Sequence, residues 1–321
     1  MRVVYGLEAF GPVDRPVYLA LGTFDGVHRG HQAVLATLRA AAAAGAGLAV
    51  ATTFDPHPLA VLARPQEPFL LTTLEERLRL FARAGLDVAL VVRFDDDLRS
   101  LDAGAWLERL RAHLAPRHLV TSTTHTFGRQ REGTAQFLQA WGAAQGIAVT
   151  VVPLVEHEGV PISSSGIRTL LRAGDVQGAA QWLGRWYSVR GVVVAGEGRG
   201  RRLGVPTANL DVPREKVVPA RGVYAAYAAV DGLTAMAAVN IGVRPTFGGG
   251  AEGVEVHLID VERDLYGQPL EVAFVDRLRS EMRFPDAEAL RRQVRLDIER
   301  ARTILSGMRS INVHQFLFAS E

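Results

Sequence analysis

The order of apolar and polar residues changes character once along this chain of 321 residues, near residue 184. Before that point, short apolar segments alternate with helix-favouring segments rich in Ala and Leu. After it, apolar segments follow one another across glycine-rich turns with no helical segment between them. The first pattern predicts a parallel sheet covered by helices, and the second predicts a small antiparallel barrel. We therefore expect an α/β protein with two domains, residues 1–184 and 185–321.

The individual elements follow from the same pattern. In the first domain we expect strands at Val17–Leu21, Leu48–Phe54, Val88–Phe94, His118–Ser122 and Ala148–Pro153, and helices near 31–44, 73–84, 102–114, 134–144, before Gly174 and over 175–183. In the second we expect strands at Val189–Ala195, Gly222–Val230, Thr234–Ile241, Val254–Val261 and Pro269–Val275, with a hairpin at Asp231-Gly232. A last helix begins near Pro285-Asp286, and we assign core packing to its apolar stripe of Leu290, Val294, Ile298, Ala301 and Leu305.

Composition narrows the class of protein. The chain is 48% hydrophobic and 22% charged, as is usual for soluble globular proteins, and it has no cysteine for disulfides or thiolate catalysis. We see no signal peptide, and no apolar run approaches the ~20 residues that span a bilayer. The net charge is only +2, with arginines interleaved among acidic residues, so no nucleic-acid-binding face is indicated. We expect a cytoplasmic enzyme acting on anionic small molecules, without membrane or nucleic-acid partners and with an oligomeric state that the sequence does not indicate.

The run GTFDGVHRGH at 22–31 places two histidines, His28 and His31, where a strand passes into a helix. Free backbone N–H groups and the helix dipole favour an anion there, and imidazoles three residues apart can converge on it. Helix capping or a surface position is the ordinary alternative for each histidine. A metal pair is the less favoured one, because no third ligand lies at a compact spacing. Lys216 is the only lysine and no Walker motif is present, so phosphates must be handled by Arg, His, amides and bound cations.

Two further segments of the first half carry polar residues suited to phosphates. TFDPHP at 53–58 directly follows an expected strand and leaves Asp55 and His57 able to point into one cleft, although a purely structural turn explains its prolines equally well. ISSSGIR at 162–168 opens a helix. Its serines can be ordinary N-caps, or they can form a cradle with Arg168 for a leaving pyrophosphate.

The second half contains a glycine loop and an acidic residue of interest. Residues 191–209 hold five glycines, three arginines and the pair Thr207 and Asn209, whose hard oxygens suit magnesium, although the pair could equally satisfy turn hydrogen bonds. Along 253–260 the alternation places Glu255 and His257 on one face. Glu255 is either a general base for a hydroxyl nucleophile or, if this face meets solvent, an ordinary surface residue.

Taken together, these segments closely resemble the bacterial bifunctional riboflavin kinase/FMN adenylyltransferase family, also called FAD synthetases. The resemblance runs from about residue 15 to about residue 303. It is carried by GTFDGVHRGH at 22–31, TFDPHP at 53–58, FGRQREG at 127–133, ISSSGIR at 162–168, GRRLGVPTANL at 200–210, GVY at 222–224, NIGVRPTF at 240–247 and EVHLIDVERDLYG at 255–267.

The resemblance implies a Rossmann-like nucleotidyltransferase domain followed by a riboflavin-kinase barrel. It implies that ATP and Mg²⁺ convert riboflavin to FMN in the barrel, and that a second ATP converts FMN to FAD in the first domain. It assigns catalytic roles to Glu255, His28, His31 and Arg168, and magnesium binding to Thr207 and Asn209. ATP or phosphate contacts fall on Gly22, Phe24, Asp25, Gly30, Ser163, Ser164, Ser165, Gly196, Gly200, Arg201, Gly204, Pro206 and Asn209. Flavin contacts fall on Asp55, Pro56, His57 and Arg279.

One segment departs from the family pattern. Where the family has Val-Gly-x-Asp/Asn-Phe-x-Phe-Gly, this chain reads Thr121–Gly128, with Ser122, Thr124 and His125 replacing the glycine, the polar residue and the first aromatic. The family uses this loop near the nucleotide and flavin of the transferase site, so a kinase with an impaired transferase half is one alternative. The others are a nucleotidyltransferase for another small phosphate and a non-enzymatic flavin-binding module. Residues 306–321 lie outside the resemblance.

Overall fold

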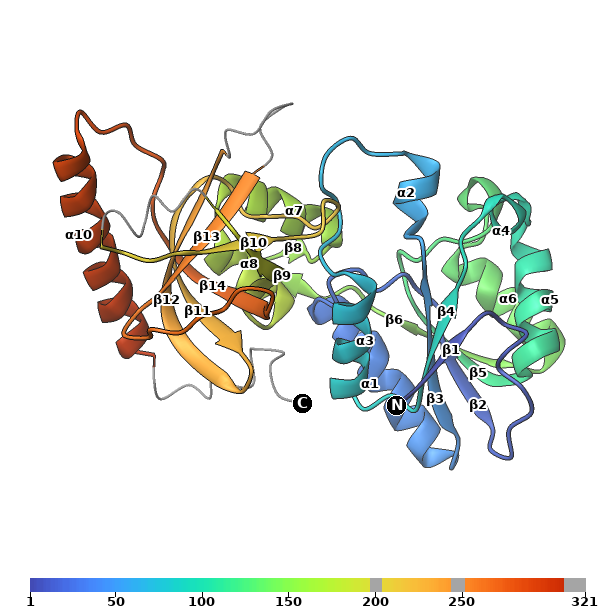
Figure 1. The fold of residues 1–321 in the computed structure, drawn as a ribbon. Coiled ribbons are helices and arrows are strands. Elements are labelled where there is room, and N and C mark those ends of the chain that lie inside the picture. Colours follow the sequence, from blue (N-terminus) through green and yellow to red (C-terminus); the bar gives the residue numbers. More distant parts are fainter. Residues whose placement is uncertain (197–203, 244–251, 309–321) are drawn as a thin grey trace. The chain divides into compact units, whose positions relative to one another are not determined.

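The computed structural model describes residues 1–196, 204–243 and 252–308 (Figure 1). The chain forms two compact units. The first comprises Met1–Glu67 and Leu71–Ser164, and the second comprises Pro68–Leu70 and Ser165–Glu321. Helices α7 (Ser164–Ala173) and α8 (Val176–Leu183), which the sequence analysis placed in the first domain, therefore pack almost entirely within the second unit.

The first unit is a six-stranded parallel sheet in the order β1-β4-β3-β2-β5-β6, as the alternating pattern predicted. The strands are β1 (Arg2–Tyr5), β2 (Val17–Ala20), β3 (Leu48–Phe54), β4 (Val88–Val92), β5 (Pro116–Ser122) and β6 (Ala148–Val152). Helices α1 (Arg29–Ala44) and α3 (Leu74–Arg83) lie on one face of the sheet, and α5 (Ala103–Leu114) and α6 (Ala135–Gln145) lie on the other (Figure 1). Because both faces are covered, β2 and β4 are buried along their whole length.

Several short elements of the first unit were not predicted. They are β1, α2 (Pro58–Leu62), α4 (Asp96–Ser100) and the hairpin of β7 (Glu156–His157) and β8 (Val160–Pro161). Each is at most five residues long, which is too short for apolar periodicity to register. β1 pairs with β4 at the sheet edge through a contact that no local pattern encodes.

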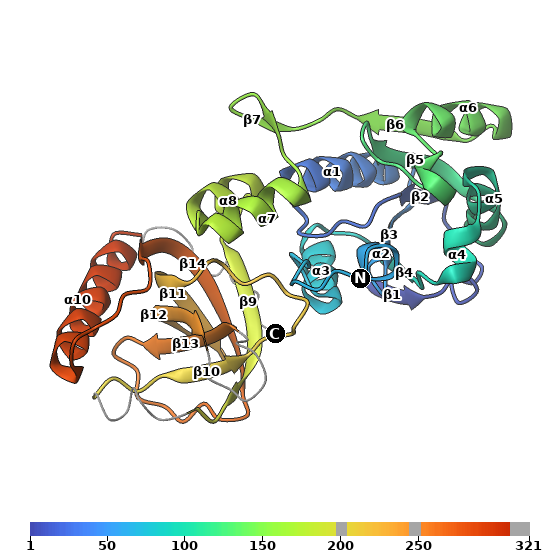
Figure 2. The same ribbon diagram turned by 90° about the horizontal axis from the view of Figure 1, so that it is seen from above.

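The second unit is a closed antiparallel barrel, as predicted (Figure 2). Its strands follow the order β10-β13-β12-β11-β14-β9, and every neighbouring pair is antiparallel. The strands are β9 (Tyr187–Val194), β10 (Ala208–Asp211), β11 (Gly222–Val230), β12 (Leu233–Val243), β13 (Glu252–Leu258) and β14 (Pro269–Arg279). The sequence analysis treated residues 206–209 as a turn and missed β10. That strand pairs with both β9 and β13, and its pairing closes the barrel.

Helix α10 (Ala287–Ser306) covers the outer face of β11, β12 and β14. Asp286 caps its first turn by accepting a hydrogen bond from the main-chain N of Ala289 at 2.7 Å. Ala301 and Leu305 of the predicted apolar stripe are fully buried, and together with Ile298 they pack against side chains of the barrel as expected. Among the described helices, none combines the length and apolar character needed to cross a membrane.

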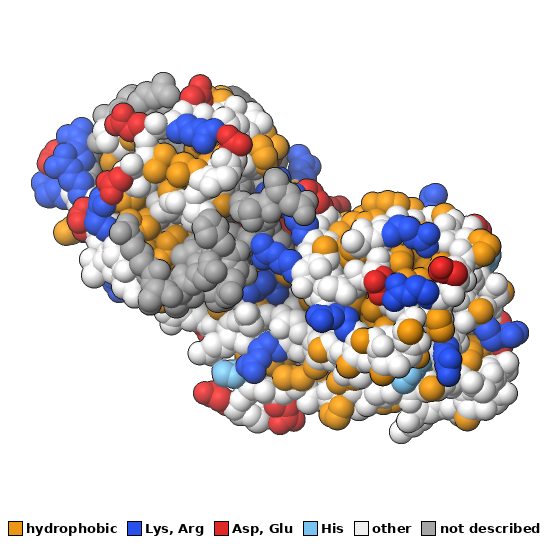
Figure 3. Space-filling view, turned by 90° about the horizontal axis from the view of Figure 1, so that it is seen from below, with side chains coloured by type: hydrophobic (Ala, Val, Ile, Leu, Met, Phe, Trp, Pro, Cys, Tyr) orange, Lys and Arg blue, Asp and Glu red, His pale blue; other side chains and the backbone are white. Residues whose placement is uncertain are grey.

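The only lysine of the chain is buried in the second unit. Lys216 is 2% exposed, and its Nζ lies 4.8 Å from the centroid of the Tyr187 ring. Its main chain forms an isolated parallel bridge to Leu70, within the same unit. The surface charge is thus carried by arginine and acidic side chains, and both signs occur on each unit on the face drawn in Figure 3.

Candidate active sites

The sheet of the first unit has a topological switch point between β2 and β5. From β2 the chain builds outward through β3 to β4 in one direction, and from β5 to β6 in the other. Ligands bind at such a point, beyond the carboxyl ends of the strands. The loop after β2, residues 21–28, and the loop after β5, residues 123–128, both begin there. The fold therefore brings the predicted phosphate loop and the segment that departs from the family pattern to the same edge of the sheet.

The two histidines of the phosphate loop stack at the start of α1. His28 is the N-cap, and its Nδ1 accepts a hydrogen bond from the main-chain N of His31 at 3.3 Å. The rings lie 3.6 Å apart between centroids at an interplanar angle of 18°, and the Phe24 ring meets His31 edge-on at 5.3 Å. His28 is buried and His31 is half-buried. The helix-capping alternative thus holds for His28, and the stack presents two imidazoles together at a helix N-terminus.

Buried hydroxyl groups fix the main chain of this loop. The N of Gly22 donates to Thr52 Oγ1 at 3.1 Å, and Thr53 Oγ1 donates to the carbonyl of Thr23 at 2.8 Å. The N of Gly26 donates to Thr72 Oγ1 at 2.9 Å. Gly26 has a φ of +83°, and a Cβ there would lie 2.8 Å from Leu71, so only glycine fits. These hydrogen bonds and the tight fit at Gly26 hold the main chain of the loop in one conformation.

Asp25 takes part in this framework. Its carboxylate is 3% exposed and accepts hydrogen bonds from the main-chain N of Leu71 at 3.1 Å, from the N of Thr72 at 2.9 Å and from the Thr72 hydroxyl at 3.1 Å. The carboxylate therefore joins the phosphate loop to residues 71–72 of its own unit. Sequence reasoning named Asp25 as a phosphate contact, whereas the structure places its side chain among backbone amides.

Sequence reasoning missed Arg77, which is 1% exposed and lies beneath the same loop. Its guanidinium donates to Thr53 Oγ1 at 2.7 Å and to the carbonyl of Thr72 at 3.1 Å. Burial lowers the pKa of Arg77, and the nearby carboxylates of Asp25, Asp55 and Glu76 oppose that shift. A usable signal was present: Arg77 precedes Phe81 by four residues, so an amphipathic helix turns both toward the sheet.

The proposed flavin segment follows β3. Asp55 and Pro56 are exposed, and the bond between them is cis. His57 is half-buried and caps α2, with its Nδ1 accepting from the main-chain N of Leu59 at 3.1 Å. His57 therefore has a structural role as a helix cap, while Asp55 is exposed.

The segment that departs from the family pattern is a short turn after β5. The main-chain N of His125 donates to the carbonyl of Ser122 at 3.2 Å. The His125 ring lies nearly parallel to that of Phe127, with centroids 5.7 Å apart and an interplanar angle of 20°. Burial lowers the pKa of His125 to about 4, so the ring is neutral near pH 7. At the position of the family's first aromatic, the chain therefore presents a flat, uncharged ring.

The serine segment at the start of α7 is divided between the two units. Ser164 donates from its Oγ to the carbonyl of Asp25 at 2.9 Å, which ties it to the phosphate loop. Ser163 and Ser165 are exposed. Arg168 belongs to the second unit, is 8% exposed and donates from Nε to the carbonyl of Phe69 at 2.5 Å. Ser164 thus contacts the histidine loop, and Arg168 bonds a residue of its own unit.

A row of polar residues crosses three strands of the barrel. The register sets Asn209 of β10 opposite Glu255 of β13, and Glu255 opposite Asn240 of β12. Directly opposed residues share one face of a sheet, so the carboxylate lies between two amides. Val254 and Val256 are buried while Glu255 is half-buried, which places this row on the outer face of the barrel. Asn240 was not named from the sequence, because only the strand register reveals it.

Gly196 lies beside the side chain of Asn209, and further predicted contacts precede Asn209 along the chain. A Cβ at Gly196 would lie 2.1 Å from Nδ2 of Asn209, so the glycine makes room for this amide. Thr207, two residues earlier, is half-buried, and the carbonyl of Pro206 lies 2.9 Å from Nδ1 of His257. Gly204 is exposed, with a φ of +76°. The predicted phosphate contacts Gly200 and Arg201 lie outside the described residues.

The oxygen donors of Thr207 and Asn209 fit magnesium better than a transition metal. These residues supply hydroxyl and amide oxygens, which are hard ligands. Within the described ranges, no group of three or more His, Cys, Asp and Glu side chains could hold a metal ion. Magnesium needs no such cage, because in nucleotide sites it takes few protein ligands and completes its shell with phosphate oxygens and water.

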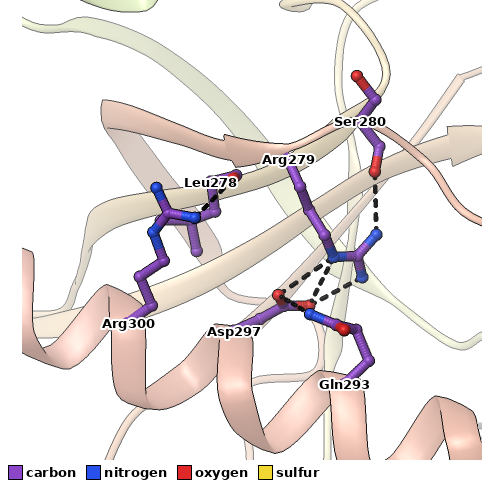
Figure 4. A network of polar contacts seen from close by, with 6 residues as sticks. All are labelled: Leu278, Arg279, Ser280, Gln293, Asp297 and Arg300. Carbon is purple, nitrogen blue, oxygen red and sulfur yellow. Dashed lines mark hydrogen bonds and ion pairs between the residues drawn. The ribbon is translucent and has the colours of Figure 1, made fainter.

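The predicted flavin contact Arg279 is occupied by an ion pair (Figure 4). Its Nε and Nη2 donate to the carboxylate of Asp297 on α10 at 3.0 and 2.8 Å, and Gln293 donates to the same carboxylate at 2.9 Å. The side chains of Arg279 and Asp297 are only 17% and 7% exposed. In this structure Arg279 joins β14 to the helix that covers the barrel.

Two family models match the chain, FAD synthetase at residues 11–166 and riboflavin kinase at residues 183–305. The bifunctional riboflavin kinase/FMN adenylyltransferase of Pseudomonas fluorescens is 38% identical over 312 residues, covering 95% of this chain and 98% of that protein. The Bacillus subtilis (strain 168) protein of the same name is 36% identical over 298 residues, covering 91% and 93%.

A solved structure is also similar along nearly the whole chain. The crystal structure titled macrolide-efflux protein from Streptococcus pneumoniae is 30% identical, covers 94% of this chain and 99% of its own, and has a TM-score of 0.86. The sequence matches cover both units, including the histidine loop of the first and the Glu255 row of the second. The chain therefore belongs to the bifunctional riboflavin kinase/FMN adenylyltransferase family.

Proposed function

We propose that the two activities of this family are divided between the two domains expected from the sequence, with FMN adenylylation in residues 1–184 and riboflavin phosphorylation in residues 185–321. The chain is an enzyme of flavin cofactor synthesis that makes FMN from riboflavin and ATP and then FAD from FMN and ATP, releasing pyrophosphate. The observation that carries the division is that the FAD synthetase and riboflavin kinase models match separate parts of the chain, and each part has its own polar site.

In the barrel we assign the general base to Glu255. Its carboxylate takes the proton of the riboflavin 5'-hydroxyl as that oxygen attacks the γ-phosphorus of ATP. Asn209 and Asn240 lie on either side of it in the strand register and limit its orientations. Thr207 and Asn209 would hold Mg²⁺ with the ATP phosphates. When bound, Mg²⁺ neutralises charge that develops on the transferred group.

In the first unit the phosphate of FMN attacks the α-phosphorus of ATP, and no covalent enzyme intermediate is needed. The pyrophosphate that leaves carries negative charge toward the N-terminus of α1, where amide N–H groups and the stacked His28 and His31 stabilise it. Ser164 is tied to the same loop and adds a hydroxyl to that end of the site. Arg168 is assigned to the same charge by the family pattern alone, because the structure describes it within the other unit.

We propose that the altered loop still serves adenylyl transfer. His125 is neutral and lies nearly parallel to Phe127 at the switch point, so the loop offers a flat aromatic surface such as a flavin or adenine ring stacks on. Exposed Asp55, at the end of the neighbouring strand β3, is the polar residue that we place against the flavin. We place the enzyme in the cytoplasm, with ATP, riboflavin, FMN and FAD as its small-molecule partners.

Chromatography of the flavins formed by the pure protein from riboflavin, ATP and Mg²⁺ tests both halves of this proposal. We expect FMN to appear first and FAD to follow. FMN alone would mean that the altered loop has impaired the transferase, and unchanged riboflavin would refute the kinase assignment. Supplying FMN in place of riboflavin tests the first unit directly, and a parallel incubation with a chelator tests the requirement for Mg²⁺.

A further inference from the structure

The buried guanidinium of Arg77 touches two separate segments of the first unit. Its Nη1 lies 2.7 Å from Thr53 Oγ1 and 3.5 Å from the carbonyl of Phe54, which are the last residues before the proposed flavin segment. Its Nε and Nη2 donate to Thr72 Oγ1 at 3.4 Å and to the Thr72 carbonyl at 3.1 Å. One planar group thus binds the end of β3 and the turn that precedes α3.

Both of these partners in turn hold the phosphate loop. Thr53 Oγ1 accepts from Arg77 and donates to the carbonyl of Thr23 at 2.8 Å. Thr72 Oγ1 accepts from the main-chain N of Gly26 at 2.9 Å and donates to Asp25 at 3.1 Å. The distance between the flavin segment and the phosphate loop is therefore set by a short chain of buried hydrogen bonds that starts at Arg77.

An arginine suits this role, and its burial would be unfavourable without such hydrogen bonds. Complete burial of a cation costs several kcal/mol unless charges and hydrogen bonds compensate it. Carboxylates from both segments, Asp25 and Asp55, act on the guanidinium, together with Glu76 of its own helix. The planar guanidinium carries donors on three separate nitrogens in a fixed geometry, whereas an ammonium group donates from a single nitrogen. An apolar side chain would fill the same space but would form no hydrogen bonds to the two segments.

We infer that Arg77 is a positioning residue for adenylyl transfer, which keeps the histidine loop and the Asp55 segment in register so that the phosphate of FMN meets the α-phosphorus of ATP in line. The inference rests on the proposed assignment of that reaction to the first unit. A misplacement of about 1 Å costs on the order of 100-fold in rate, so the effect belongs in kcat, with the KM values of ATP and FMN little changed.

The test compares Arg77→Met, Arg77→Lys and Thr53→Val in the full chain, with FMN supplied as substrate. We expect kcat for FAD formation to fall about 100-fold in Arg77→Met and about 10-fold in Thr53→Val and Arg77→Lys, with each KM within threefold of wild type. Arg39→Met and Thr150→Val are the matched controls, since Arg39 is exposed and bonds the Ala84 carbonyl, and Thr150 lies on the edge strand β6. Both should match wild type.

FMN formation from riboflavin, measured in the same preparations, reports the amount of active second unit, and denaturant unfolding of the first unit reports whether each variant is folded. Hydrogen exchange at the amides of Gly26, Leu71 and Thr72 gives a second readout, and we expect it to speed up in the Arg77 variants. If Arg77→Met fails to fold, the Thr53→Val and Arg77→Lys variants carry the test. An unchanged kcat, or a rise in KM alone, would overturn the inference. Absence of FAD from wild type would refute the transferase assignment itself, and the inference with it.

Discussion

Each unit of the molecule holds an arginine largely out of solvent, and the two are used in opposite ways. The hydrogen bonds of Arg77 in the first unit go to hydroxyl and carbonyl oxygens of Thr53, Phe54 and Thr72. Those of Arg279 in the second go chiefly to one carboxylate, that of Asp297. The first arginine therefore organises loops, and the second fixes a helix to a barrel.

The difference follows from where each site is built. Adenylyl transfer is assigned to loops beyond the ends of parallel strands, and loops need buried polar partners to keep one conformation. The kinase residues Asn209, Glu255 and Asn240 lie on paired strands, whose ladder already sets their spacing. The barrel needs only a helix held over one face, and a single ion pair suffices for that.

The largest effect is expected for Glu255→Gln, which tests the general base of the kinase site on the paired strands. Loss of the general base should lower FMN formation about 1000-fold, while FAD formation from supplied FMN stays at the wild-type rate. Flavin chromatography with each substrate in turn measures both rates. Glu262→Gln, which neutralises an exposed carboxylate beyond the same strand, is the control. Retention of FMN formation by Glu255→Gln would show that the carboxylate is a surface residue.

Asp297→Asn tests the ion pair that anchors α10. It leaves the buried Arg279 without its carboxylate, and we expect a loss of about 3 kcal/mol in the free energy of unfolding of the barrel. Denaturant unfolding measures it, and the double variant Arg279→Met/Asp297→Leu should recover much of the loss. If Arg279 instead contacts the flavin, as the sequence predicted, Arg279→Met should raise the KM for riboflavin and Asp297→Asn should not.

His31→Ala is the counterpart of Glu255→Gln in the first unit. Removing one of the stacked imidazoles should lower FAD formation about 100-fold and leave FMN formation unchanged. His113→Ala, on the exposed face of α5, is the matched control. A parallel loss of FMN formation would mean that the two sites are not independent.

The smallest expected effect concerns pH. The pKa of His125 is lowered to about 4 by burial, so the unfolded chain binds a proton near pH 6.5 that the folded chain does not. Stability should therefore be fully present above about pH 6.5 and fall by on the order of 2 kcal/mol as the pH drops toward 4. The variant His125→Phe should lack this component when unfolding is followed across that window. Equal pH profiles for the two proteins would contradict a buried neutral imidazole.

Much of the fold was accessible from the sequence because its long elements carry strong periodic patterns. The parallel sheet, the barrel and the final helix were all predicted. The closing strand β10 was missed because its four residues contain a polar pair and gain their pairing only from distant β9 and β13. The proximity of His28 and His31 was accessible because they lie three residues apart at the start of one helix, and their roles in a site stay predictions.

Contacts that join distant segments were not accessible. The assignment of Asp25 and Arg279 to ligands stays a prediction, and the structure gives each a protein partner from another segment, Leu71 and Thr72 for the first and Asp297 for the second. Arg77 was not considered, because a basic residue on an amphipathic helix is usually solvated. Its partners at 53–54 and 72 come together only when the sheet has formed. Long-range hydrogen bonding therefore decides which polar residues remain available for ligands.

Because Lys216 is buried against Tyr187, its chemical reactivity can report opening of the second unit. Reagents that acylate primary amines need an accessible, deprotonated Nζ, and the only lysine of the chain is 2% exposed in the folded second unit. Acylation of this lysine in a peptide map would therefore appear only when that unit opens. The rate of such labelling would measure opening of the barrel alone, in the intact two-unit protein, without any engineered probe.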